Sequence, residues 1–164
     1  MKAIQVVKIL AAIAAVGVLT GCESKAESAP AGAGKKGFVG NIESMTVGNA
    51  EFRKVLYTAK NLQLVLMALK PGEEIGAEAH KPDQFFRVEA GSGEVVIDGV
   101  KTELQAGFAV IVPGGARHNI INTGKVPMKL YTLYAPPNHR DGVVHPTRAD
   151  AERDGEHFEG KTTE

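Results

Sequence analysis

Four potential metal donors lie in two short stretches of the chain. Glu78 and His80 are two residues apart, so on a strand both side chains leave from the same face. Gln84 begins the next run of alternating apolar residues, and His118 begins a later one, shortly after a turn at residues 113–115. Two imidazoles and one carboxylate are donors typical of non-haem iron sites, and an amide oxygen is a weaker fourth donor. The pattern predicts a site for one divalent transition metal ion, either manganese, iron, nickel or zinc.

Each of these residues also has an ordinary structural interpretation. Glu78 and Gln84 could be solvated strand residues, and His80 could be a hydrogen-bonded histidine of the core. That interpretation is preferable for any one of them alone. Four donors on strands that can close around one axis favour the metal site.

The residues between 38 and 138 carry the pattern of an all-β sandwich or barrel. Short apolar or alternating runs are separated by turn residues. Asp98-Gly99 is a strong hairpin signal between two of the runs. The expected strands are residues 52–58, 62–69, 84–88, 94–97, 100–104, 108–112, 118–122 and 128–134.

Parity along these strands predicts which residues face the interior. If Gln84 points inward, Phe86 and Val88 point the same way. The run 62–69 is apolar on both faces in its later part, which is typical of a central strand. The predicted pocket is apolar around the metal donors, with Phe86, Val88, Ile120, Leu64 and Leu66 as its lining.

The order and spacing of these residues resemble the two motifs of the cupin superfamily. The first motif is a glycine, a His-x-His pair, a glutamate and a later glycine, and its places are taken by Gly72, Glu78, His80, Gln84 and Gly91. The second motif is a glycine, a Pro-x-Gly turn, a histidine and an asparagine, here Gly107, Pro113, Gly115, His118 and Asn122. The resemblance covers roughly residues 60 to 135. It implies a double-stranded β-helix, or jelly-roll barrel.

Two positions depart from the family's pattern. Glu78 replaces the first histidine, and Gln84 replaces the glutamate. The two changes compensate in charge, so the metal ion would still meet a single negative ligand. Asn122 is expected near His118, either supporting it or satisfying backbone groups.

The resemblance leaves two classes of function open. The enzymes of the superfamily that it resembles include sugar isomerases of the phosphomannose type, dioxygenases and decarboxylases. An isomerase needs a base near the substrate carbon, and no inward lysine or second carboxylate is evident, whereas an oxygenase needs less from the protein. The alternative is a non-catalytic ligand-binding or sensing module at the cell envelope. In either class we expect a small oxygen-donor ligand on the metal, a sugar, hydroxy acid or enediol, and a homodimer is compatible with the sequence.

The first residues are typical of an export signal. Lys2 and Lys8 form a positively charged start before an apolar run at residues 9–19, which is too short to span a bilayer comfortably. The run ends in Leu-Thr-Gly before Cys22, which resembles the lipobox of bacterial lipoproteins. We therefore predict a signal peptide at residues 1–21, lipidation of Cys22, and a flexible tether at residues 22–37. The alternative is an ordinary signal peptide with an incidental cysteine.

These features place the protein in the bacterial cell envelope, lipid-anchored and facing the periplasm or the surface. Cys22 is the chain's only cysteine, and acylation gives this lone thiol of an exported protein a role.

Length and charge limit the remaining options. The 164 residues suffice for one domain with a core, predicted here as a barrel at residues 38–138. The formal net charge is zero and there is no block of basic residues, so nucleic-acid binding by phosphate neutralisation has no support.

The C-terminal tail, residues 139–164, contains three further histidines. His139, His145 and His157 have spacings that match no pattern of metal ligands we can defend. Residues 148–153 predict a short helix capped by Thr147. We expect a tail that wraps the barrel, from which His139 or His145 could reach the barrel mouth as an acid or base.

Overall fold

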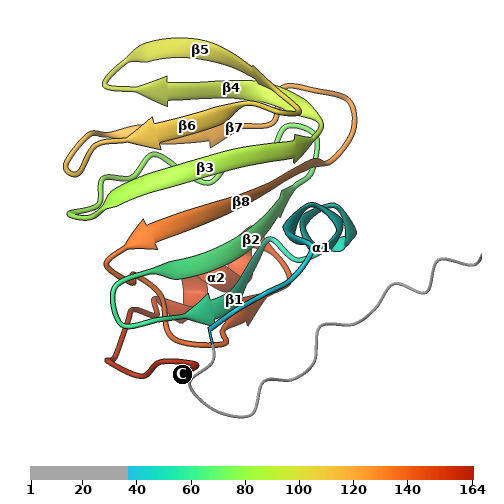
Figure 1. The fold of residues 1–164 in the computed structure, drawn as a ribbon. Helices are drawn as coiled ribbons and strands as arrows, with labels where there is room; N and C mark the ends of the chain where they lie inside the picture. Colours follow the sequence, from blue (N-terminus) through green and yellow to red (C-terminus); the bar gives the residue numbers. More distant parts are fainter. Residues whose placement is uncertain (1–36) are drawn as a thin grey trace, which may run out of the picture.

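The computed structural model describes residues 37–164. In chain order its elements are α1 (Ile42–Gly48), β1 (Arg53–Thr58), β2 (Gln63–Leu69), β3 (Asp83–Ala90), β4 (Ser92–Ile97), β5 (Val100–Gln105), β6 (Ala109–Val112), β7 (His118–Ile121), β8 (Met128–Ala135), β9 (Val144–His145) and α2 (Arg148–Asp154). The strands form two antiparallel sheets, a larger one in the order β6-β3-β8-β2-β1-β9 and a smaller one in the order β5-β4-β7 (Figure 1). This arrangement confirms the predicted all-β double-stranded β-helix.

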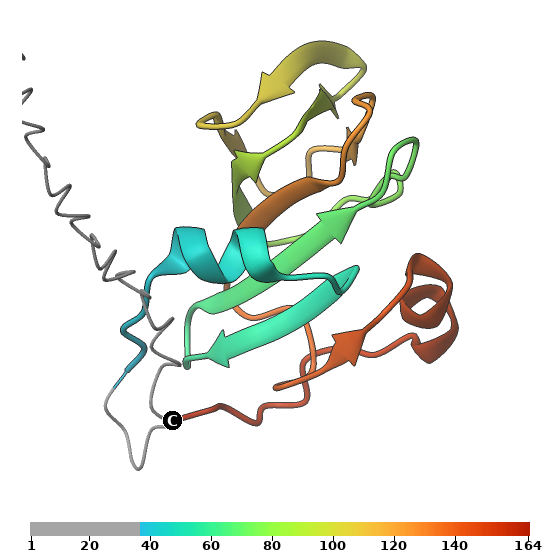
Figure 2. The same cartoon turned by 90° about the vertical axis from the view of Figure 1, so that its right-hand side faces the viewer.

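The strand predictions agree with the structure where local chemistry determines the element. Asp98 and Gly99 have φ values of 47° and 83°, as the hairpin turn between β4 and β5 requires. α2 begins after Thr147, whose side chain forms a reciprocal capping box with Asp150. Figure 2 shows α1 and α2 as separate short helices at different places on the barrel.

The inward face of the larger sheet follows from its register. Phe86 of β3 lies opposite Thr132 of β8, and Thr132 lies opposite Val65 of β2. Residues that lie opposite one another in a ladder point to the same face, so this row faces the interior. All three are completely buried, and burying a side chain such as that of Phe86 stabilises the fold by about 1.5–3 kcal/mol.

Two of the predicted lining residues are on the wrong face. Leu64 lies opposite Leu133, which in turn lies opposite Phe85 on the outward face of β3. Leu66 has the same parity as Leu64 and lines a groove on the outer surface beside Met45 of α1. The prediction failed because β2 is apolar on both faces, and α1 covers part of the outer one.

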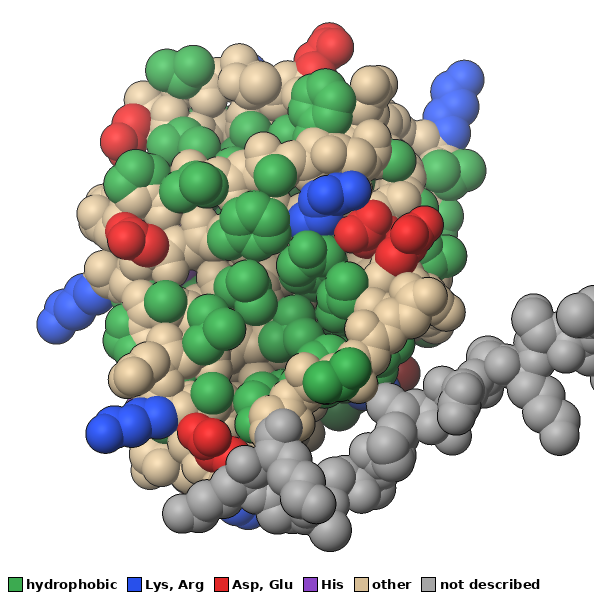
Figure 3. Space-filling model, in the orientation of Figure 1, with side chains coloured by type: hydrophobic (Ala, Val, Ile, Leu, Met, Phe, Trp, Pro, Cys, Tyr) green, Lys and Arg blue, Asp and Glu red, His purple; other side chains and the backbone are tan. Residues whose placement is uncertain are grey.

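The outer face of the larger sheet is unusually apolar. Figure 3 shows hydrophobic side chains gathered over this side of the molecule. Phe85 lies between Leu133 and Ile111 in register, and Ile111 is 71% exposed at the edge strand β6. Contiguous exposed apolar surface is typical of an interaction face. The homodimer stays a prediction.

The structure adds several features that the sequence did not predict. β8, the last of the expected strands along the chain, lies between β3 and β2 inside the larger sheet. β6, the edge strand beside β3, alternates between exposed and buried residues, because successive side chains point to opposite faces of the sheet. The tail contributes β9, which pairs with β1, and a helix that we did not expect, α1, is capped by Asn41.

The predictions for the N-terminal part concern residues outside this description. The signal peptide at residues 1–21 and the lipidation site Cys22 lie there, as does the tether at 22–37 apart from Gly37. Between residues 37 and 164, no helix is long and apolar enough to cross a membrane.

Candidate metal centre

Backbone pairing brings Glu78 and His118 together. The segment that carries Glu78 runs antiparallel to β7, and the two residues lie opposite each other. The Glu78 N–H donates to the His118 carbonyl at 2.9 Å, and the His118 N–H donates to the Glu78 carbonyl at 2.8 Å. Residues paired in this way project their side chains to the same face. Residues forty positions apart in the chain therefore share one wall of the barrel.

The turn at residues 113–115 fixes the second ligand candidate, His80. The Gly115 N–H donates to the His80 carbonyl at 2.7 Å, and the Gly114 N–H donates to Asp83 Oδ1 at 2.8 Å. A Cβ atom at Gly114 would lie 2.4 Å from the Lys81 carbonyl oxygen, so only glycine fits there. The two sequence motifs are thus joined by hydrogen bonds at this turn, and the close approach of the Lys81 carbonyl explains the glycine at position 114.

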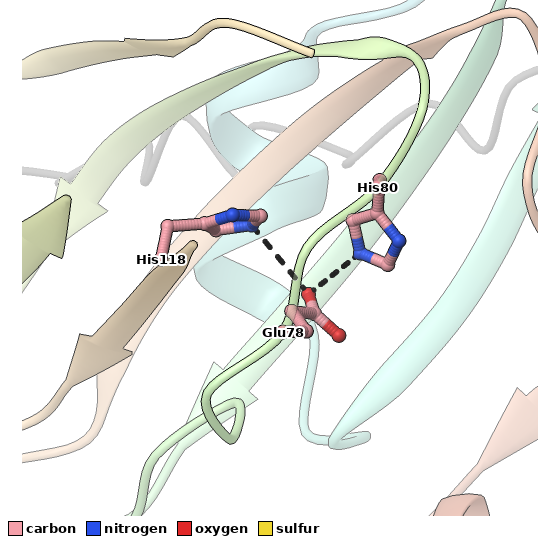
Figure 4. Close-up of side chains that lie close together, drawn as sticks. All are labelled: Glu78, His80 and His118. Carbon is pink, nitrogen blue, oxygen red and sulfur yellow. Dashed lines mark ion pairs between the residues drawn. The ribbon is translucent and has the colours of Figure 1, made fainter. Parts of the chain in front are cut away.

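The three side chains converge on one point (Figure 4). Glu78 Oε1 lies 2.9 Å from His80 Nε2 and 3.7 Å from His118 Nε2, and one ligand atom from each residue lies within 4.8 Å of the others. The side chain of His118 is 1% exposed, whereas those of His80 and Glu78 are 16% and 27% exposed. The group is closed on the His118 side and open to small molecules on the other.

Hydrogen bonding prepares His118 as a ligand. Its Nδ1 lies 3.1 Å from the Ala116 carbonyl oxygen, which can only accept, so Nδ1 donates there and Nε2 is the ring atom that faces Glu78. A backbone carbonyl on the far ring nitrogen is the usual support of a metal-binding histidine. Phe86 packs edge-on against the ring, with centroids 6.0 Å apart, and restricts its rotation.

The orphaned polar atoms at this point fit a metal ion. His118 Nε2 and Gln84 Oε1 are buried and lack a hydrogen-bond partner, while the buried His80 Nε2 lies beside the carboxylate of Glu78. Buried polar atoms are rarely left unpaired, and each one needs an explanation. Two nitrogen donors and a carboxylate are a recognised ligand set for divalent transition ions. The cluster of Glu78, His80 and His118 could therefore bind such an ion.

Gln84 lies on the same interior wall, as parity predicts. It is 2% exposed, it lies opposite Tyr134 in register, and the Tyr134 ring contacts that of His80. Gln84 Nε2 donates to Thr132 Oγ1 at 3.1 Å, which fixes the amide and leaves Oε1 as a free acceptor. Its role as a fourth, weaker ligand stays a prediction.

The pKa of the Glu78 carboxyl group is lower than its ordinary value at this site. Burial raises the pKa of its carboxyl group, but contact with His80 and the charges of His80, His118 and Arg53 lower the pKa by more. Glu78 is therefore ionised at neutral pH and provides a negative ligand.

Asn122 has a structural role. Its side chain is completely buried, donates to the carbonyls of Leu69 and Val126, and accepts from the Gly124 N–H. Of the two roles considered from the sequence, backbone satisfaction is the one observed.

Sequence reasoning missed part of the surroundings of the cluster. Arg53 of β1 and Glu156 of the tail lie within 3.4 Å of each other, and Glu156 also contacts His139 at 2.8 Å. Arg53 shares the parity of Val55 in a predicted strand, so its inward position could have been inferred. Glu156 carried no such signal, because it follows α2 in a segment without a pattern.

Comparisons with known proteins agree with this geometry. A family model described as a cupin domain matches residues 65–134. The crystal structure of BH2720 from Bacillus halodurans has a TM-score of 0.71 and 43% identity, covering 73% of this chain and 96% of that one. The chain belongs to the cupin superfamily.

Two curated proteins similar to this cupin differ in how much they share. YrkC of Bacillus subtilis, an uncharacterized protein, is 48% identical over 125 residues, which cover 72% of this chain and 67% of YrkC. The dimethylsulfoniopropionate lyase DddW of Ruegeria pomeroyi is 36% identical over 62 residues, which cover 38% of this chain and 41% of DddW. Because YrkC is uncharacterized, the longer similarity indicates no activity. The similarity to DddW covers only part of the barrel.

Proposed function

We propose that this cupin binds one divalent transition metal ion and holds a small oxygen-donor molecule on it. The ligands are Glu78, His80 and His118, with Gln84 as a weaker fourth donor. The observation that carries the proposal is the convergence of two buried Nε2 atoms and one carboxylate oxygen within 4.8 Å. His118 Nε2 has no hydrogen-bond partner inside the protein, and His80 Nε2 lies beside the carboxylate of Glu78, which is itself a metal donor.

The surroundings support a small organic ligand. When bound, a divalent ion supplies Lewis acidity to an oxygen atom of the ligand. Phe86, Val65 and Ile120 are completely buried and provide apolar walls, while the Glu78 side is open. An apolar pocket with a few convergent polar groups suits a sugar, hydroxy acid or enediol.

Enzyme and binder remain the two alternatives. The partial similarity to a lyase supports catalysis in a barrel of this kind. The second candidate is a non-catalytic ligand-binding or sensing module at the cell envelope, which the lipobox-like segment before Cys22 favours. We further propose that the protein is lipid-anchored through Cys22.

A relaxation titration of the manganese-loaded full chain tests the ligand proposal. Bound Mn²⁺ enhances water-proton relaxation, and a ligand that displaces its water lowers the signal. We expect at least one member of a panel of sugars, hydroxy acids and enediols to lower it at millimolar concentration. No effect from any member would show that the metal is structural and would refute the proposed function.

A further inference from the structure

Arg53 is a buried cation without a full set of partners. It lies opposite Met67 in the ladder and shares an inward parity with Val55, and both of these are core residues. Its side chain is 14% exposed, and Nη1 reaches Glu156 Oε1 only at 3.4 Å. Its Nε atom is buried and has no hydrogen-bond partner. A buried N–H donor of this kind calls for an acceptor.

His139 has a buried ring nitrogen that can accept a hydrogen bond but has no donor. Its Nδ1 lies 2.8 Å from Glu156 Oε1, and because the carboxylate only accepts, Nδ1 carries the proton and Nε2 is an acceptor. Nε2 is buried and unpartnered. Burial lowers the pKa of His139 despite Glu156, so the ring is neutral at pH 7.

A buried glutamine holds His139 in place. Gln63 Oε1 accepts from the His139 N–H at 2.9 Å, and Gln63 Nε2 donates to the His139 carbonyl at 2.7 Å. Gln63 lies at the start of β2, in the core of the larger sheet. The tail therefore presents His139 in a defined position and not as a loose end.

Both residues lie beside the metal centre. The Tyr134 ring packs edge-on against both His80 and His139, with centroid distances of 5.6 and 5.0 Å. Arg53 Nη1 and His139 Nδ1 both reach Glu156 Oε1, so these two residues lie together in this interior. The interior that contains the metal ligand candidates thus also contains a donor without an acceptor, Arg53 Nε, and an acceptor without a donor, His139 Nε2.

We propose that Arg53 and His139 form a subsite that selects an α-hydroxy carboxylate as the ligand of the metal centre. The Arg53 Nε–H donates to the carboxylate, and His139 Nε2 accepts from the hydroxyl group. This inference rests on the proposed function and narrows its three ligand classes to one. A divalent ion and Arg53 together outweigh the charges of Glu78 and Glu156, so the interior favours an anion over a neutral sugar.

The alternative is that Arg53 and His139 only attach the tail to the barrel through Glu156. Attachment accounts for the His139 Nδ1 contact and the Arg53 Nη1 contact. It does not account for the two atoms that point elsewhere and lack partners, Arg53 Nε and His139 Nε2. A test must therefore measure ligand selectivity as well as stability.

Three probes of equal carbon number separate the two contacts. Lactate carries a carboxylate and a hydroxyl, propionate only the carboxylate, and 1,2-propanediol only hydroxyls. Their affinities for the manganese-loaded full chain are measured by water-proton relaxation. Lactate should bind tightest, and Arg53→Gln should weaken lactate and propionate by about 10-fold or more, because a hydrogen bond to a charged group is lost. Affinity for 1,2-propanediol should not change.

The variants of His139 and the controls complete the design. His139→Phe keeps a ring against Tyr134 and removes the acceptor, so it should weaken lactate but not propionate. Arg53→Lys keeps the charge and lacks Nε, and should fall between wild type and Arg53→Gln. Arg87→Gln is the matched control, since Arg87 also has a buried, unpartnered Nε but lies on the outward face of β3. Metal content and thermal unfolding of each variant confirm that it is loaded and folded.

The outcomes distinguish this inference from the proposal on which it rests. If 1,2-propanediol binds as tightly as lactate, or if Arg53→Gln and Arg87→Gln have equal effects, the subsite is wrong while the metal–ligand function stands. If no probe changes the relaxation signal and the wider panel of sugars and enediols does not either, both fall.

Discussion

Replacing Glu156 by glutamine should destabilise the protein strongly, although Glu156 lies in the C-terminal tail. Its side chain is 1% exposed and accepts hydrogen bonds from His139 Nδ1 at 2.8 Å and the Arg140 N–H at 2.7 Å, with Arg53 3.4 Å away. Glutamine keeps one acceptor and turns the other oxygen into a donor. One charged hydrogen bond is lost, and Arg53 loses its counter-ion.

The magnitude follows from these contacts. A hydrogen bond to a charged group contributes about 1.5–3 kcal/mol, and removing one partner of a buried ion pair costs about 3–5 kcal/mol. Arg53 retains some contact with solvent, and its distance from Glu156 is long. We therefore expect Glu156→Gln to lower the free energy of unfolding by about 2–4 kcal/mol at pH 7.

The effect should depend on pH. Burial raises the pKa of Glu156, but the hydrogen bonds from His139 and Arg140 and the nearby charges lower it below its ordinary value of 4.5. A carboxyl group with a lowered folded-state pKa contributes stability that is fully present above its unfolded pKa and is lost as the pH falls through its folded pKa. The difference between wild type and variant should be complete at pH 7 and shrink below pH 4.5.

Urea denaturation of both proteins at pH 7 and at pH 4 measures these differences. The matched control is Glu152→Gln, because Glu152 pairs with Arg148 on the surface and its side chain is 64% exposed. Exposed pairs contribute about 0–1 kcal/mol, so the control should change little. A loss for Glu156→Gln no larger than that of the control, or a loss that grows toward low pH, would refute the reasoning.

Three further predictions concern the turn, the metal-bound charge and the anchor. Gly114→Ala should lower the stability by about 1–3 kcal/mol in thermal or urea unfolding, because the new carbon lies 2.4 Å from the Lys81 carbonyl oxygen. Gly48→Ala, whose new carbon meets nothing within 4 Å, is its control. Glu78→Gln should impair ligand binding to the manganese form more than Gln84→Ala does, since it removes the negative ligand. Cys22→Ala should abolish fatty-acid labelling and release processed protein in soluble form.

Each of these has an outcome that contradicts it. Equal stabilities of Gly114→Ala and Gly48→Ala would show that the turn does not hold the two motifs together. Unchanged ligand affinity in Glu78→Gln would remove the carboxylate from the centre. A wild-type protein that takes up no acyl chain, with a Cys22→Ala variant that stays on the membrane, would rule out the lipid anchor.

Features encoded locally were predictable from the sequence. The Asp98-Gly99 turn sets the β4–β5 hairpin by its backbone preferences, and Thr147 caps α2 through its own side chain. The inward row of Gln84 and Phe86 follows from strand parity once one member is placed. The three converging ligand candidates were found from their residue types and spacing and from the resemblance to the two cupin motifs.

The remainder depended on tertiary contacts. Leu64 and Leu66 were placed on the wrong face, because parity cannot choose between two apolar faces of β2. The pairing of Arg53 with Glu156 joins β1 to a residue more than a hundred positions later, in a segment without periodicity. The surroundings of the metal centre therefore required the fold, whereas its ligands did not.

The number of metal ions bound per chain tests the central claim most directly. The full chain is reconstituted separately with manganese, iron, nickel and zinc, dialysed, and analysed for elemental content beside His80→Ala, His118→Ala, Gln84→Ala and the exposed control His157→Ala. We expect one ion per chain in wild type and His157→Ala, a reduced affinity in Gln84→Ala, and loss of the ion in the other two, which lack a strong nitrogen donor. A wild type that retains no ion from any of the four metals, or His80→Ala and His118→Ala variants that retain as much as His157→Ala, would contradict the account.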